Sequence, residues 1–206
     1  MKDACRLVVG GIVLFGLGLS FYSAVIDTDR EFPFSLVRHL SFLTIITNWL
    51  IVFAMFFPVL AKETQIGQFF DRPGVRTAIL DYIIIVAVGF HLLLAHLYTY
   101  QGVDIISDFI VHTAAPILVA LEWLFFTRKG SLSFRQVPFW LLAPLAYMLY
   151  CILRGELTGN YPYSLINADE RGHAAAVMIY GQFTIGYFLV GCLLVAIAKL
   201  PFLPKD

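Results

Sequence analysis

The chain has 206 residues, of which 60% are apolar and only 14% are charged, and its formal net charge is zero. Soluble domains are usually about 45–50% apolar and about 25% charged, so this composition excludes an ordinary water-soluble fold. A neutral chain also gives no reason to expect nucleic acid as a partner. The apolar residues stand in long runs, which is typical of a protein embedded in a membrane.

Six stretches carry almost no charge over nearly the length of a membrane span. The hydrocarbon layer is about 30 Å thick, so a helix that crosses it needs about 20 such residues. Because lipid offers no hydrogen-bond partners, each stretch is expected to be helical. We therefore predict an all-α, polytopic bundle of six transmembrane helices that forms one domain, residues 1–206, with helices at about 7–26, 39–61, 80–101, 108–127, 137–154 and 174–198.

Lysine and arginine are distributed unequally between the two sides of this predicted bundle. Ten lie on the side of the termini, namely Lys2, Arg6, Lys62, Arg72, Arg76, Arg128, Lys129, Arg135, Lys199 and Lys205. Four lie on the other side, namely Arg30, Arg38, Arg154 and Arg171. Because cytoplasmic loops carry the excess of positive charge, the pattern predicts a multi-pass protein of the cell membrane with both termini in the cytoplasm.

Polar side chains within the second and fourth predicted helices share one depth. Thr44, Thr47 and Asn48 have the i, i+3, i+4 spacing of one helix face, and Asp108 and His112 are four residues apart. Thr44 lies six residues inside Arg38, or about 9 Å, and His112 lies four residues inside Asp108, or about 6 Å. Since the second helix enters the membrane from the side on which the fourth begins, Thr44 and His112 are expected near the same end of the bundle.

Other polar residues are expected at that end as well, namely His96, Arg154, Tyr161 and Tyr163. Asp81 lies at the opposite end, where an interfacial ion pair with the nearby Arg76 explains it. Ionisable groups at membrane depth are costly and are usually functional, so the convergence of polar residues predicts a site.

A hydroxyl and an imidazole in one cavity can form a nucleophile and its base. His112 would take the Thr44 proton, Asp108 would fix the imidazole tautomer, and Asn48 or Arg154 would stabilise an oxyanion. The competing interpretation is structural, because a membrane threonine commonly bonds its own i−4 carbonyl, and Thr47 remains an alternative nucleophile. No metal-ligand spacing or phosphate loop is present in the sequence, so neither a metal nor a cofactor is predicted.

Three segments resemble a known family. They are Phe42-Leu43-Thr44-Ile45-Ile46-Thr47-Asn48, then His112-Thr113-Ala114-Ala115-Pro116 with Leu121-Glu122-Trp123, and Tyr150 to Arg154-Gly155 with Tyr161-Pro162-Tyr163. Together they resemble the androgen-induced and androgen-dependent membrane-protein family, most closely its bacterial branch, over nearly the whole chain. Animal members are six-helix hydrolases that cleave fatty acid esters of hydroxy fatty acids. The resemblance implies that Thr44 is the nucleophile and His112 the base.

The sequence therefore predicts an integral membrane lipid-ester hydrolase of the threonine type, whose partners are membrane lipids and a lipid ester substrate. Fatty acid esters of hydroxy fatty acids are the substrates that the resemblance implies. The alternative is a non-enzymatic lipid-binding or transport protein that uses the same cavity. The two differ in one respect, because only the hydrolase requires the Thr44 hydroxyl.

Overall fold

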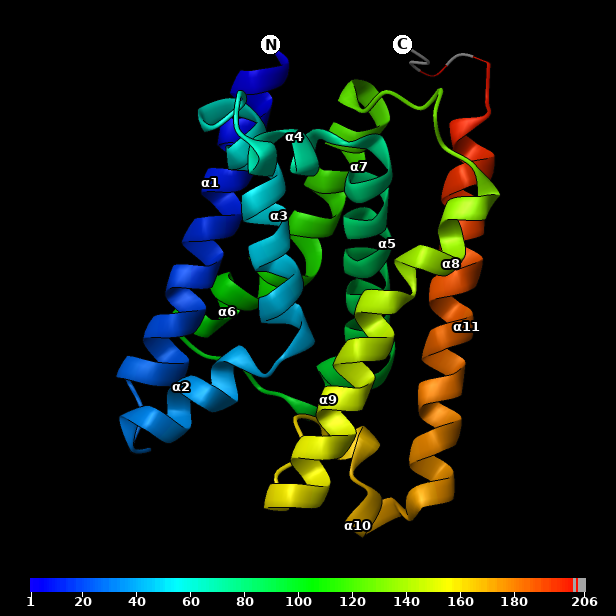
Figure 1. Ribbon diagram of the computed structural model, residues 1–206. Coiled ribbons are helices and arrows are strands. Elements are labelled where there is room, and N and C mark those ends of the chain that lie inside the picture. Colours follow the sequence, from blue (N-terminus) through cyan, green and yellow to red (C-terminus); the bar gives the residue numbers. More distant parts are fainter. Residues whose placement is uncertain (202, 204–206) are drawn as a thin grey trace.

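The structure, a computed structural model, describes residues 1–201 and 203. In this part of the chain six helical spans are long and apolar enough to cross a membrane, and no strand is present. The predicted all-α polytopic bundle is confirmed. Helix α1 begins and α11 ends at the same end of the bundle (Figure 1). Lys205, which contributes to the predicted orientation, lies outside the described residues.

The spans are built from several consecutive elements. The first two spans and the segment after them comprise α1 (Lys2–Phe21), η1 (Tyr22–Ile26), α2 (Phe32–Leu40), α3 (Leu43–Leu60) and α4 (Gln65–Asp71). The third and fourth comprise α5 (Pro73–Gly89), η2 (Phe90–Leu94), η3 (Ala95–Leu97), α6 (Val103–Phe109), η4 (Ile110–Ala114) and α7 (Ala115–Phe126). The last two comprise η5 (Phe134–Gln136), α8 (Val137–Trp140), α9 (Leu142–Thr158), η6 (Ser164–Ile166), α10 (Ala168–Arg171) and α11 (His173–Ala198).

The second span begins at Leu43 and not at residue 39, because the chain turns between α2 and α3. Phe42 has the extended dihedrals φ −78° and ψ 131°, which break the helix before Leu43. Helix α9 holds this turn, since the Tyr147 hydroxyl donates to the Ser41 carbonyl at 2.9 Å. The break makes Thr44 the second residue of α3 and so places it at a helix N-terminus.

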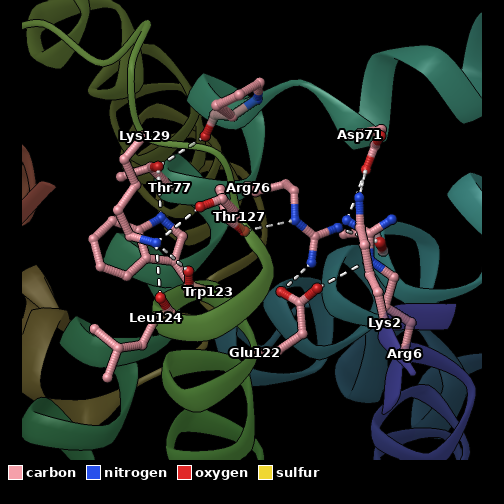
Figure 2. Close-up of polar contacts among 12 residues, drawn as sticks. Lys2, Arg6, Asp71, Arg76, Thr77, Glu122, Trp123, Leu124, Thr127 and Lys129 are labelled. Carbon is pink, nitrogen blue, oxygen red and sulfur yellow. Dashed lines mark hydrogen bonds and ion pairs between the residues drawn. The ribbon is translucent and has the colours of Figure 1, made fainter. Parts of the chain in front are cut away.

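A buried carboxylate joins three helices at the end of the bundle where α1 begins (Figure 2). Glu122 of α7 is 1% exposed and lies between two guanidinium groups. Arg6 of α1 donates to one carboxylate oxygen at 2.9 Å, and Arg76 of α5 donates to the other. Both arginines are also buried, so the charges are compensated by one another and not by water.

Both arginines have further partners. Arg76 donates to the Thr127 hydroxyl at 3.1 Å and to the Ala54 carbonyl at 2.8 Å, which ties α3 into the cluster. Arg6 pairs with Asp71 of α4 at 2.7 Å. Burial raises the pKa of Asp71, but the charge and hydrogen bond of Arg6 outweigh that effect and leave the pKa below its ordinary value. A nearly complete set of partners is what makes buried charge tolerable in a membrane bundle.

The predicted ion pair between Asp81 and Arg76 is wrong. Positions five apart on a helix are separated by about 140° around its axis, so the two side chains face different neighbours. Arg76 pairs with Glu122, whereas Asp81 is 0% exposed and its oxygens accept no hydrogen bond from any described residue. Asp81 instead faces α11 near Gly191.

Substitution of these two buried acids is expected to change the stability of the fold by very different amounts. We expect Glu122→Gln to destabilise the fold by about 3–5 kcal/mol, because it leaves two buried guanidinium groups without their shared counter-charge. Asp81→Asn is the matched control and should change stability little, since its carboxyl has no partner to lose among the described residues. Unfolding of both variants in detergent measures the difference, and equal losses would contradict the bridging role of Glu122.

Candidate active site

Thr44 lies in the first turn of α3, where backbone N–H groups have no partner inside the helix. The Leu43 N–H donates to the Tyr163 hydroxyl at 2.9 Å, and the Ile46 N–H donates to the Phe42 carbonyl. The N–H groups of Thr44 and Ile45 meet no acceptor in the described chain. This end of α3 therefore presents a hydroxyl beside unpaired donors and the positive end of the helix dipole.

His112 lies in a π-helical turn, and Pro116 explains the turn. Proline has no N–H to donate to the carbonyl four residues earlier, which is that of His112, and its ring crowds that carbonyl. The helical hydrogen-bond pattern therefore changes, and the Ala115 N–H donates to the Ile110 carbonyl, five residues earlier. Widened turns of this kind are frequent at functional sites because they displace one side chain from the regular helix face.

Thr44, His112 and Asp108 form a continuous hydrogen-bonded chain. The Thr44 Oγ1 atom lies 3.1 Å from His112 Nε2, and His112 Nδ1 lies 2.8 Å from an Asp108 oxygen. The side chain of Asp108 interacts with Tyr100 too, and burial together with the Asp108 charge raises the pKa of Tyr100. A carboxylate that accepts from Nδ1–H leaves Nε2 unprotonated, which is the form that can accept the Thr44 proton.

Phe90 holds the imidazole in this position. Its ring lies parallel to the His112 ring with 3.7 Å between centroids and 8° between planes. Phe90 begins a π-helical turn of its own, so two irregular turns on neighbouring spans meet at His112. The sequence carries no signal for Phe90, because aromatic residues are common in every span of this chain.

Tyr163 reaches the same point from the connection between α9 and α11. Its hydroxyl accepts from the Leu43 N–H, and its side chain interacts with those of Thr44 and Tyr147. Burial raises the pKa of Tyr163 to about 12, so its hydroxyl stays protonated at neutral pH. Tyr163 therefore places a neutral, protonated hydroxyl beside Thr44.

Two cavities adjoin Thr44, and both are lined by Thr44, Phe90, Leu94 and Tyr163. The first lies between α5, α9 and α11, and no charged side chain of the described residues lines it. The second is lined by His112 and Asp108 and by residues of η1 and α2. Thr44 thus lies between an apolar compartment and a polar one.

Asn48 and Thr47, which share the predicted face with Thr44, line neither cavity. The Asn48 amide donates to the Thr44 carbonyl at 2.8 Å and to the Val111 carbonyl at 3.2 Å. Its N–H groups are thus already used, and the expected role as an oxyanion donor is corrected to one of joining α3 to η4. Thr47 is 1% exposed, and its hydroxyl makes no hydrogen bond with any described residue.

Arg154, Tyr161 and His96 do not meet at Thr44 either. Arg154 donates to the Ser41 hydroxyl and to Tyr150, so it supports the turn before α3 and is not the oxyanion donor that the sequence suggests. Tyr161 packs on Gly155 and donates to Glu156 at 3.0 Å. His96 is exposed and lines neither cavity. The sequence predicts the end of the bundle at which these residues lie. It does not predict the direction of each side chain, because that direction depends on how its helix is rotated.

Comparison with protein-family models, with curated proteins and with solved structures finds no match for this chain.

Replacing Asn48 tests whether its amide joins the two helices of the site. We expect Asn48→Leu, which keeps the volume, to cost about 1–3 kcal/mol, because it leaves the buried Val111 carbonyl without a donor. Thr47→Val on the same helix is the control and should cost much less. Thermal unfolding in detergent reports both values, and a neutral Asn48→Leu variant would refute the linking role.

Proposed function

We propose that the chain is an integral membrane lipid-ester hydrolase in which Thr44 is the nucleophile and His112 the general base. The observation that carries this proposal is the chain of contacts from Thr44 through His112 to Asp108, placed between an apolar and a polar cavity. A threonine with only a packing role would have no need of an oriented imidazole. The resemblance of Phe42-Leu43-Thr44 and His112-Thr113 to the androgen-induced and androgen-dependent family supports the same pair.

The first step forms an acyl-enzyme. Thr44 Oγ1 attacks the ester carbonyl while its proton passes to His112 Nε2, and Asp108 stabilises the imidazolium that results. The carbonyl electron pair moves to the oxygen, where the Tyr163 hydroxyl and the unpaired N–H groups at the start of α3 can donate to it. When the tetrahedral intermediate collapses, the alcohol leaves with the proton from His112.

The second step releases the acid. Water enters through the polar cavity, His112 removes its proton, and the water oxygen attacks the threonine ester. The second tetrahedral intermediate then collapses, Thr44 recovers its proton from His112, and a free fatty acid leaves. Each step replaces one C–O bond of the acyl carbon with another and changes no oxidation state. The side chains of the site and one water molecule therefore supply every atom and proton that the reaction requires.

The proposal extends to substrate class and membrane orientation. The apolar cavity beside Thr44 suits an acyl chain, and fatty acid esters of hydroxy fatty acids are the esters that the family resemblance implies. The excess of Lys and Arg at the end where α1 begins supports a cytoplasmic location for the termini, with the site near the opposite face of the cell membrane.

Loss of either member of the pair should abolish turnover. For Thr44→Ala and His112→Ala we expect hydrolysis of a branched fatty acid ester to fall on the order of 10³-fold or more. Thr47→Val should retain activity, because its hydroxyl lies outside both cavities. Release of free fatty acid by purified protein is the measurement, with thermal unfolding as the folding control.

The outcome also separates the hydrolase from its alternative. Activity that survives in Thr44→Ala would remove the nucleophile from the proposal. An inactive wild type across several ester classes would favour the non-enzymatic lipid-binding or transport protein.

Asp108→Asn tests the tautomer argument separately. An asparagine amide would donate to Nδ1, so the imidazole proton would move to Nε2 and face Thr44, where it cannot accept the hydroxyl proton. We expect kcat to fall by about 10³–10⁴-fold with KM little changed. Asp104→Asn, which changes a neighbouring cavity carboxylate with no contact to His112 in the described chain, should keep kcat within a few-fold. Equal effects of the two substitutions would count against an orienting role for Asp108.

A further inference from the structure

Arg38 brings a positive charge into the polar cavity that also contains Thr44 and His112. It lies in the last turn of α2, is partly buried, and its guanidinium packs 5.9 Å from the centre of the Phe42 ring. Arg30, on the connection before α2, lines the same cavity. The esterase chemistry proposed above uses neither residue.

Arg38 makes no ion pair with any carboxylate of the described chain. Burial lowers the pKa of Arg38, the like charges of Arg30 and Arg154 lower it further, and Tyr98 opposes the shift only in part. The cavity carboxylates, Asp104 and Asp108, interact with Tyr100 and form no ion pair with Arg38. A partly desolvated guanidinium among other cations is an arrangement that an anion stabilises.

The place of the anion follows from the two cavities. The apolar cavity has no charged side chain among its described lining residues, so it suits the acyl chain and cannot compensate an ionised group. The alcohol part of an ester bound at Thr44 must then extend into the polar cavity, toward Arg38. Guanidinium binds carboxylate and phosphate oxygens with the same paired donors, so the recognised chemistry is an oxyanion.

We propose that Arg38, assisted by Arg30, is the specificity-determining residue of this site and binds a carboxylate or phosphate carried by the alcohol portion of the lipid ester. The proposal rests on the proposed hydrolase function. It predicts that the enzyme prefers esters whose leaving alcohol is anionic, and that the preference resides in binding and not in the chemical step.

The test uses three esters with the same acyl chain and with a neutral, a carboxylate-bearing or a phosphate-bearing alcohol. We expect Arg38→Gln to raise KM for the anionic ester about tenfold or more, with kcat and the neutral ester little affected. Arg38→Lys should restore part of the loss, and Arg135→Gln, which changes an exposed arginine that lines neither cavity, should have no effect. Comparison of the two anionic esters identifies which oxyanion is recognised.

A wild type that shows no preference for anionic esters, or an Arg38→Gln variant that loses neutral and anionic esters equally, would overturn the proposal. A binding measurement separates it from the hydrolase itself. In the Thr44→Ala background, a fatty acid, an alkyl phosphate and a fatty alcohol are titrated by calorimetry in a neutral detergent. If no ester is cleaved, weaker binding of the anionic amphiphiles alone in Arg38→Gln supports the anion site, and unchanged binding removes it.

Discussion

The bundle depends on the buried ion pairs that the Glu122 carboxylate makes with two arginines. That carboxylate accepts from Arg6 and Arg76 and so joins α1, α5 and α7, while Arg76 extends the cluster to α3 through the Ala54 carbonyl. In lipid there is no water to replace a missing partner, so this set of charges can only be buried together. Because α7 continues from η4, the contact that anchors one end of the fourth span also sets the rotation of His112 near the other end.

The site itself is built where the helices are irregular. Thr44 follows the helix break between α2 and α3, and His112 and Phe90 lie in π-helical turns. Irregular backbone at membrane depth is tolerated where it is buried in protein or lines a cavity. The turn at Phe90 lines both cavities, and the turn at His112 lines the polar one. The break before α3 also leaves backbone N–H groups at the start of α3 without acceptors. The irregular backbone thus provides the donors that the proposed reaction uses.

Support for this region comes from the fifth span and the connection after it. Tyr147 and Arg154 of α9 bond Ser41, and Tyr163 bonds the Leu43 N–H. These contacts hold the turn between α2 and α3, and Phe42 packs against the hydrophobic core and the Tyr163 ring. Arg154 thereby acts on the nucleophile through the backbone and not through the reacting atoms.

Hydrophobicity along the sequence determined the helical class, the six spans and the grouping of Thr44 with His112 by depth, because residue count converts directly into distance along a helix. The four-residue spacing of Asp108 and His112 was equally readable, since it places both on one face. The tertiary structure alone decided which neighbours each face meets. It paired Arg76 with Glu122 and left Asp81 without a hydrogen-bond partner among the described residues. It also occupied the Asn48 amide with carbonyls, and turned Arg154 to Ser41 and Arg38 into the cavity. Those outcomes depend on the rotation and packing of helices far apart in the chain, which a one-dimensional pattern does not contain.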